Sequence, residues 1–236
     1  MELQYRRVLI KISGEALAGK SGRGIDFDFL EEVCGKIKKC SDMGAQIGIV
    51  IGGGNYWRGV KDGGGRMRRS RADYMGMLAT AMNCLAALDC LERIGAEARL
   101  LSAIAMNEIG EAFSCDKAIR YLCEGKTVLF ACGTGEPYFS TDTAAALRAA
   151  EIEADAILLA KNVDGVYDKD PKKDPTAVKF DEISYDEVLS RRLGVMDAAA
   201  TAIAMENRIP IQVFALEDTE NIVRAVTGEK TGTKVF

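Results

Sequence analysis

Two overlapping phosphate-binding patterns lie near the start of the chain, in residues 11–24, KISGEALAGKSGRG. The first is the P-loop spacing GxxxxGK[ST], which Gly14, Gly19, Lys20 and Ser21 satisfy. The second is a lysine at the end of a strand, followed at once by a serine and a glycine. The two patterns assign the phosphate-binding charge to different lysines and imply different folds.

The P-loop interpretation requires a helix to begin at its Lys-Ser pair, because the helix N-terminus binds the phosphates. Here Lys20 and Ser21 are followed by GRGIDFD, and the next helical period begins only near Phe27. Gly22 and Gly24 would each cost about 1 kcal/mol in a helix relative to alanine. The sequence therefore disfavours the P-loop.

The second pattern places Lys11 at the carboxyl end of a strand over residues 6–12, where ligands of open α/β sheets bind. A strand-end lysine is ordinarily only solvated, so this interpretation needs support. The next strand supplies it, because it ends in three consecutive glycines, residues 52–54. Glycines let a backbone approach an anion closely, and Arg58 follows as a bidentate phosphate donor.

A third glycine-bearing loop, GTGEPYFSTD, covers residues 133–142 and also follows a strand. Its hydroxyl groups are small donors, and Tyr138 and Phe139 offer a flat apolar surface for a base or a ribose. Thr141 or Asp142 can cap the helix that follows. Three such loops at one edge of a parallel sheet predict a site for two phosphorylated ligands.

The elements that must position these loops are strands alternating with helices. The strand-like runs are nearly continuous in apolar residues, as in strands buried on both faces, and cover residues 6–12, 46–51, 97–103, 127–132, 155–160 and 209–214. Helical patterns cover residues 28–44, 70–95, 114–125, 141–154 and 184–194. The sequence therefore predicts an α/β fold, a three-layer αβα sandwich with a mainly parallel central sheet. The polar residues 162–184 predict a loop containing a hairpin.

Composition narrows the function classes. The chain has 236 residues, a formal net charge of −4 and no histidine. Histidine-dependent triads and bases are thus excluded, whereas phosphoryl transfer by Lys, Arg, Asp and backbone amides stays open. Mild acidity disfavours nucleic acid as a partner. Seven cysteines without a CxxC pair predict reduced thiols in a cytoplasmic protein, and we expect no secretory leader and no membrane span.

Six motifs in order carry a resemblance to a known family. They are KISGEAL (11–17), VIGGGNYWRG (50–59), ADYMGMLAT (72–80), GTGEPYFSTD (133–142), NVDGVYDKDP (162–171) and VMDAAA (195–200). With them the chain resembles, from end to end, the bacterial uridylate (UMP) kinases of the amino acid kinase superfamily. The resemblance implies one domain, residues 1–236, with an acceptor-binding lobe (about 1–150) and an ATP-binding lobe (about 151–236).

The implied reaction transfers the γ-phosphoryl of Mg-ATP to UMP, giving UDP for pyrimidine nucleotide biosynthesis. Mg²⁺ enters with ATP, and no metal site of the protein itself is implied. The resemblance also implies a homohexamer, activated by GTP and inhibited by UTP.

The resemblance assigns roles to residues at the matching motif positions. Those implied for ATP are Lys11, Ile12, Ser13, Gly14, Gly54, Arg58, Asn162, Tyr167 and Asp170. Those implied for UMP are Gly53, Asp73, Thr134, Gly135, Glu136, Pro137, Tyr138, Phe139, Ser140 and Thr141. The implied catalytic residues are Lys11, Arg58 and Asp197, and the segment implied for GTP is Gly19, Lys20, Ser21, Gly22, Arg23 and Gly24.

Three departures from the family pattern leave questions open. Glu136 stands where the family usually has an amide, and a carboxylate there would repel a phosphate unless it points away. The run LLAKNVDGVY is one residue shorter than in some relatives, so either Lys161 or Asn162 faces the nucleotide. The basic residues 61–71 form either a lid over the phosphates or a solvated loop.

Two alternatives to the leading hypothesis remain. One is another superfamily enzyme that acts on a carboxylate or a carbamate, and the other is a non-catalytic sensor of pyrimidine nucleotides. The aromatic pair Tyr138–Phe139 and the guanidinium of Arg58 favour a nucleotide acceptor.

Overall fold

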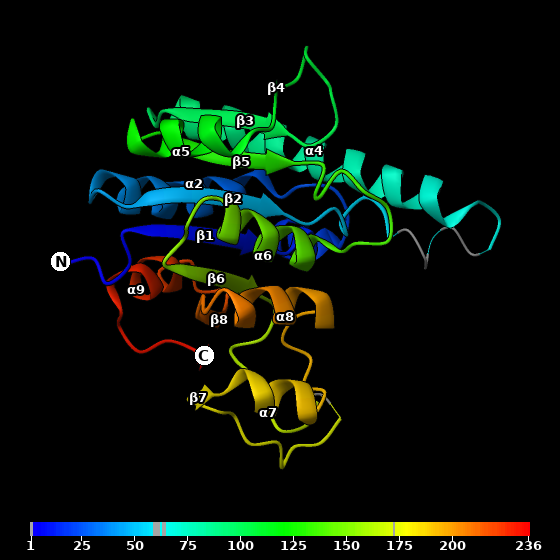
Figure 1. Cartoon of the computed structure of the whole chain (residues 1–236), viewed down its shortest axis with the longest axis vertical. Helices are drawn as coiled ribbons and strands as arrows, with labels where there is room; N and C mark the ends of the chain where they lie inside the picture. The colour runs from blue at the N-terminus through cyan, green and yellow to red at the C-terminus, as the bar shows by residue number, and fades with distance from the viewer. Residues whose placement is uncertain (1, 59–61, 63–64, 172) are drawn as a thin grey trace.

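One nine-stranded sheet forms the centre of the molecule (Figure 1). The structure is a computed structural model that describes residues 2–58, 62, 65–171 and 173–236. The strands lie in the order β4-β3-β5-β2-β1-β6-β8-β9-β7. Their bounds are β1 Arg7–Ile12, β2 Gln46–Ile51, β3 Ala98–Ser102, β4 Glu111–Ala112, β5 Thr127–Ala131, β6 Ala156–Lys161, β7 Glu182–Ile183, β8 Ile211–Ala215 and β9 Thr233–Val235. The β8–β9 pair is antiparallel, and the other pairs of neighbours are parallel.

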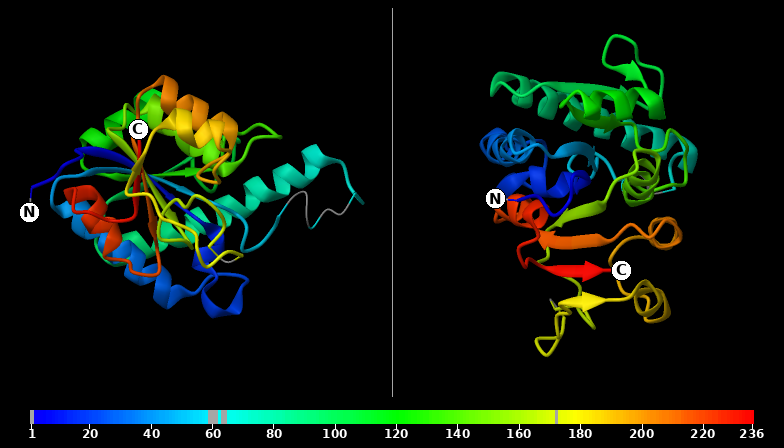
Figure 2. Two further views of the ribbon diagram at one scale, coloured as in Figure 1. Left: turned by 90° about the horizontal axis from the view of Figure 1, so that it is seen from below. Right: turned by 60° about the vertical axis from the view of Figure 1, so that its left-hand side comes forward.

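Helices cover both faces of the sheet (Figure 2). Their bounds are α1 Gly14–Leu17, α2 Phe27–Asp42, α4 Arg69–Arg93, α5 Cys115–Cys123, α6 Thr141–Glu151, α7 Tyr185–Ser190, α8 Ala198–Glu206 and α9 Asn221–Thr227, with a 3-10 turn η1 at Gly19–Ser21. One apolar cluster packs α2, α4 and α9 on one face, and a second packs α5 to α8 on the other. The predicted three-layer αβα sandwich is confirmed.

The six predicted strands are confirmed within two residues at each end. Strands β4, β7 and β9 were missed, because two or three residues are too few to show a pattern. The hairpin predicted in residues 162–184 is reduced to one antiparallel bridge between Tyr167 and Lys179. Polar side chains begin several helices, as the capping rules require: Asp26, Ser114, Ser140, Ser184 and Asp197 each accept a backbone N–H.

The pairing of β1 with β6 joins the two halves of the chain. These strands are parallel and in continuous register, with Lys11 opposite Leu159. Strands from β1 to β5 lie on one side of this junction and strands from β6 to β9 on the other. The division into two lobes at about residue 150 remains a prediction, since one uninterrupted sheet crosses it.

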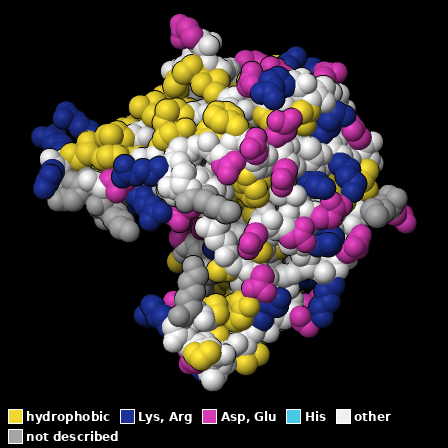
Figure 3. Space-filling view, turned by 180° about the vertical axis from the view of Figure 1, so that it is seen from behind, with side chains coloured by type: hydrophobic (Ala, Val, Ile, Leu, Met, Phe, Trp, Pro, Cys, Tyr) yellow, Lys and Arg dark blue, Asp and Glu magenta, His cyan; other side chains and the backbone are white. Residues whose placement is uncertain are grey.

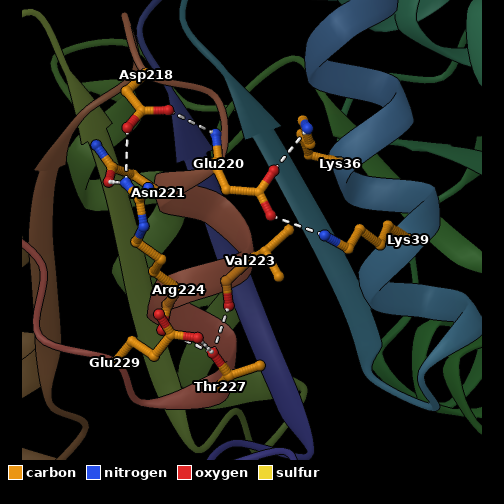
Figure 4. Close-up of polar contacts among 9 residues, drawn as sticks. All are labelled: Lys36, Lys39, Asp218, Glu220, Asn221, Val223, Arg224, Thr227 and Glu229. Carbon is orange, nitrogen blue, oxygen red and sulfur yellow. Dashed lines mark hydrogen bonds and ion pairs between the residues drawn. The ribbon is translucent and has the colours of Figure 1, made fainter. Parts of the chain in front are cut away.

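Helices α2 and α9 are joined at the surface by an ion cluster (Figure 4). The carboxylate of Glu220 accepts from Lys36 Nζ at 2.6 Å and from Lys39 Nζ at 2.7 Å. The two hydrogen bonds, with that of Lys36 first, lower the pKa of Glu220 to about 2. Asp218 and Arg224 pair at 2.6 Å beside it.

Helix α4 corrects the expectation that no segment reaches membrane-spanning length. Its 25 residues include a stretch with mean hydropathy 1.3, which passes that test by length and composition. Half of this stretch is buried inside the protein, as in the core helix of a globular domain. Within the described residues, α4 is the one helix that passes.

Candidate active site

The carboxyl end of β1 holds a buried ion pair. Lys11 Nζ lies 2.7 Å from Asp142 Oδ1, and both side chains are largely shielded from water. Asp142 lies in the first turn of α6, whose cap is Ser140: its hydroxyl accepts from the N–H groups of Asp142 and Thr143 at 2.9 and 3.1 Å. The cap expected at Thr141 or Asp142 is therefore wrong, and Asp142 is left to hold Lys11.

Lys161, the last residue of β6, faces the same charges. Burial lowers its pKa, and Lys11 adds to that effect while Asp142 opposes it. Its ammonium donates to the carbonyl of Val195 and, at 3.5 Å, to that of Gly194. Asn162 lines a different cavity, of about 870 Å³, together with Glu15, Gly19 and other residues. Of the two candidates, Lys161 is the one that faces the Lys11–Asp142 pair.

The glycines after β1 and β2 are required by close approach of backbones. A Cβ on Gly14 would lie 2.2 Å from the carbonyl oxygen of Gly52. A Cβ on Gly53 would lie 2.7 Å from the carbonyl oxygen of Gly76 in α4. The sequence attributed these glycines to the close approach of an anion, but at Gly14 and Gly53 it is neighbouring backbone that leaves no room for a side chain.

A buried pair of amides fixes this glycine loop. Asn83 in α4 donates to the carbonyl of Gly52 at 2.7 Å and to Asn55 Oδ1 at 2.8 Å. Asn55 donates back to Asn83 at 2.9 Å and to the carbonyl of Gly24 at 2.7 Å. No role was predicted for Asn83, although an asparagine inside an apolar helix was a usable signal.

A cavity of about 320 Å³ lies between the glycine loop, α4 and the loop after β5. Seven of the ten residues predicted for UMP line it: Gly53, Asp73, Thr134, Glu136, Phe139, Ser140 and Thr141. Gly54 and Arg58, expected on the ATP side, line it as well. We call it the acceptor cavity, and Gly135, Pro137 and Tyr138 belong to its loop without lining it.

Contacts between α4 and this loop shape the acceptor cavity. Asp73 accepts the backbone N–H of Tyr138 at 2.9 Å, where the backbone is left-handed with φ of 74°. The guanidinium of Arg69 lies 4.8 Å from the centre of the Tyr138 ring. Arg148, a buried residue that sequence reasoning missed, donates to the carbonyl of Gly133 at 3.3 Å. The loop is therefore held at its start and near its tip.

Asp197 connects α8 to α6. It caps α8 at the N–H of Ala200, and it accepts from the hydroxyls of Ser140 and Thr143, the latter at 2.9 Å. Burial alone would raise the pKa of Asp197, but these hydrogen bonds outweigh it and hold that pKa below its ordinary value. Asp197 thus positions Ser140, which caps α6 and lines the acceptor cavity.

Arg58 reaches the acceptor cavity with its charge already paired. Its guanidinium lies 2.8 Å from the carboxylate of Glu15, just after Gly14. Both side chains are exposed, so the contact is screened by water and a phosphate can replace it. Glu136 is also exposed, and its backbone rather than its carboxylate bonds to Thr134.

The residues predicted for the adenine and ribose are divided between two cavities. Tyr167 and Asp170 line a cavity of about 360 Å³ with Arg191 and Arg192, while Asn162 lies in the larger cavity described above. Ile12 ends β1, and Ser13 donates its N–H to the carbonyl of Ala160 at 3.3 Å.

The P-loop alternative does not fit the backbone. Ser21 ends the short turn η1, Gly22 is left-handed with φ of 69°, and α2 begins later with Asp26 as its cap. Segment 19–24 instead joins the glycine loop, since Gly24 and Asn55 exchange hydrogen bonds. The side chain of Lys20 lies outside the part of the chain that the structure describes. The basic loop predicted at residues 61–71 lies partly outside the described residues.

Glycine loops at the carboxyl edge of a parallel sheet, a buried strand-end lysine and a cavity lined by two of these loops are typical of α/β proteins that transfer phosphoryl groups. The chain belongs to the amino acid kinase family, whose model matches residues 6–215.

Solved structures agree with this assignment. A UMP kinase from Bacillus anthracis shares 36% identity and a TM-score of 0.94, covering 98% of this chain and 96% of its own. A UMP kinase from Ureaplasma parvum shares 39% identity and a TM-score of 0.92, covering 100% and 99%. A uridylate kinase from Archaeoglobus fulgidus shares 29% identity and a TM-score of 0.75, covering 97% and 99%.

Proposed function

We propose that this chain is a UMP kinase that transfers the γ-phosphoryl of Mg-ATP to UMP and releases UDP and ADP for pyrimidine nucleotide synthesis. One observation carries the proposal beyond the resemblance to solved UMP kinases. Thr141 lines the acceptor cavity, and the next residue, Asp142, holds Lys11. The acceptor cavity and the lysine that serves the phosphoryl group are thus joined through one turn of α6.

In the proposed reaction, an oxygen of the UMP phosphate attacks the γ-phosphorus, and the bond to the β-phosphate oxygen breaks. Lys11 stabilises the charge on the transferring group, and Arg58 exchanges Glu15 for a phosphate oxygen. No general base is required, because the attacking phosphate oxygen is already ionised. Lys161, whose ammonium donates to the carbonyl groups of Val195 and Gly194, lies close enough to Asp142 and Lys11 to feel their charges and offers a second cation.

Mg²⁺ is brought by ATP in this proposal. The carboxylates at this edge already have partners, Asp142 with Lys11 and Asp197 with two hydroxyls. The described residues contain no group of three carboxylate or thiol ligands that could hold a metal ion. In this proposal the phosphate oxygens of ATP and water supply most of the ligands of Mg²⁺.

The nucleotide and regulatory assignments extend the proposal. ATP occupies the Tyr167–Asp170 cavity, whose Arg191 and Arg192 suit its negative charge. GTP activates through segment 19–24, which is hydrogen-bonded to the glycine loop by Gly24 and Asn55. We further propose that UTP inhibits the enzyme. By the same resemblance the enzyme is a homohexamer in the cytoplasm, and nucleic acid is not among its partners.

The test is ADP formation from Mg-ATP with UMP, CMP, AMP, acetylglutamate or carbamate as acceptor, with and without GTP. We expect turnover with UMP alone, increased by GTP. Turnover with acetylglutamate or carbamate would leave the fold assignment unchanged but would give the protein the substrate of another enzyme of the family. Tight UMP binding without turnover would make the protein a nucleotide sensor.

A further inference from the structure

Two charged side chains are buried among the residues that the structure describes, those of Lys11 and Arg148. The other charged side chains of this part of the chain reach the surface at least in part, as Figure 3 shows for one face of the molecule. A buried charge is costly unless it is paired, and even then it gives little net stability. Lys11 serves the proposed reaction. The burial of Arg148, in α6, therefore needs a physical reason of its own.

The guanidinium of Arg148 makes three contacts that fix its plane. Its Nη1 lies 2.5 Å from Glu151 Oε2, and its carbon lies 3.7 Å from the centre of the Phe113 ring. Its Nη2 donates to the carbonyl of Gly133 at 3.3 Å. Phe113 in turn packs edge-on against Phe130 of β5, with ring centres 5.9 Å apart. The ion pair and the ring thus hold the guanidinium in one orientation, with a donor directed at the loop after β5.

The carbonyl of Gly133 belongs to an unusual turn. Cys132 and Gly133 follow β5 directly, and both have left-handed backbone, with φ of 64° and 59°. This conformation is unfavourable for a residue with a side chain, such as Cys132, so contacts around the turn must maintain it. The hydroxyl of Thr80 accepts the N–H of Cys132 at 2.9 Å, and Arg148 donates to the carbonyl of Gly133.

The same turn shapes the acceptor cavity, which Gly133 and Thr134 line. If the peptide after Gly133 were free to rotate, its carbonyl oxygen could turn toward the cavity and oppose a phosphate there. The guanidinium of Arg148 holds this oxygen and with it the position of Thr134.

We propose that Arg148 is a positioning residue for the acceptor: its guanidinium, fixed by Glu151 and Phe113, holds the turn at Cys132–Gly133 in the conformation that binds UMP. The inference rests on the proposed function, since it takes the acceptor cavity as the UMP site. The cavity proposed for ATP, that of Tyr167–Asp170, is lined by other segments. Arg148 therefore affects the affinity for the acceptor and not that for ATP.

Calorimetric titration of UMP and of a non-hydrolysable ATP analogue tests this selectivity. Arg148→Met should raise the Kd for UMP at least about tenfold and change that for the analogue by less than about twofold. Arg148→Lys keeps the charge but loses the planar fork, and it should raise the Kd for UMP by about threefold to tenfold. The matched control is Arg120→Met, which removes an arginine 5.1 Å from the ring of Tyr121 whose side chain is 61% exposed. It should leave both affinities unchanged.

A double-mutant cycle tests whether the ring acts through the guanidinium. Phe113→Leu should raise the Kd for UMP by about twofold to fivefold. The double variant Arg148→Met/Phe113→Leu should bind UMP no more weakly than Arg148→Met alone, because the ring then has no guanidinium to hold. Effects that multiply as independent changes would overturn the proposal.

Two further outcomes would overturn it. One is an unchanged Kd for UMP in Arg148→Met, and the other is an equal loss of affinity for UMP and the analogue, which would mean that Arg148 serves only the fold. If Arg148→Met does not fold, Arg148→Lys and Phe113→Leu decide the question through the same two Kd values. Wild-type protein that binds no UMP would instead contradict the proposed function itself.

Discussion

Two lysine–carboxylate contacts in this molecule have the same chemistry and different surroundings. Lys11 and Asp142 meet at 2.7 Å with side chains 9% and 19% exposed, at the carboxyl edge of the sheet. Lys36 and Glu220 meet at 2.6 Å with side chains 33% and 32% exposed, between α2 and α9. The two distances are nearly equal, so the contacts differ mainly in how far water reaches the charged groups.

Burial decides what each contact can do. Water and salt screen the α2–α9 cluster, and exposed pairs of this kind contribute about 0–1 kcal/mol. A buried pair gives little net stability, yet removing one partner costs about 3–5 kcal/mol. A dehydrated ammonium also acts strongly on a nearby phosphate. We therefore expect the buried contact to serve the proposed phosphoryl transfer, whereas the exposed contact joins two helices.

The largest expected effect comes from Lys11→Met. It should lower kcat for UMP phosphorylation by about a hundredfold to a thousandfold or more, because a charge aimed at the transferring group is lost. Lys36→Met is the matched control and should change kcat by less than about twofold, since exposed pairs contribute little. Steady-state kinetics on both variants decide the comparison.

Measurements of stability distinguish the role of the Lys11 charge in catalysis from its role in holding the fold. Lys11→Met leaves Asp142 without its cation, so unfolding should become easier by up to about 3–5 kcal/mol. Lys11→Met/Asp142→Asn should recover much of this stability and none of the activity. Recovery of activity in the double variant would mean that Lys11 serves only the fold.

Alanine in place of glycine sharpens the contrast between the two regions. Gly53→Ala places a Cβ 2.7 Å from the Gly76 carbonyl oxygen, and such overpacking should cost about 1–3 kcal/mol and weaken UMP binding. Gly35→Ala in α2 meets nothing within 4 Å and should stabilise by up to about 1 kcal/mol. Denaturant unfolding measures the change in the free energy of unfolding for both variants. Changes of the same sign in Gly53→Ala and Gly35→Ala would contradict the role of packing proposed for Gly53.

Asp197→Ala removes the cap of α8 and the acceptor for Ser140. We expect a loss of about 1–2 kcal/mol and a higher KM for UMP, because Ser140 lines the acceptor cavity. The pKa of Asp197 is lowered on folding, so its stabilising effect is present at neutral pH and is lost as pH falls through that pKa. Thermal melts of variant and wild type should therefore converge in acid.

The smallest effect is expected for Glu220→Gln, at most about 1 kcal/mol. The folded pKa of Glu220, about 2, lies below the ordinary value of 4.5, so its contribution is full above pH 4.5 and disappears toward pH 2. The difference in Tm should also shrink in high salt. A difference that persists in molar salt would show that the cluster is not screened.

The sequence predicted the layers better than the contacts. Continuous apolar runs located six strands, because strands buried on both faces carry that signature locally. The glycine loops were also predicted correctly, because a run of glycines directly after a strand is visible in the local sequence. The Lys11–Asp142 pair spans distant segments that meet only through the sheet order, and Asp142 was considered only as a helix cap. Arg148 was missed because the Gly133 carbonyl, to which it donates, is a backbone group that a sequence does not display. Asn83 did leave a signal, an amide inside an apolar helix, that went unused.

We expect the buried lysine, Lys11, to act on the transfer step and not on acceptor binding. Rapid-quench single turnover of Mg-ATP with saturating UMP measures that step directly in wild type, Lys11→Met and Lys36→Met. We expect transfer to be at least about a hundredfold slower in Lys11→Met alone, with its Kd for UMP near that of wild type. Transfer at the wild-type rate, or a loss explained entirely by weaker UMP binding, would contradict it.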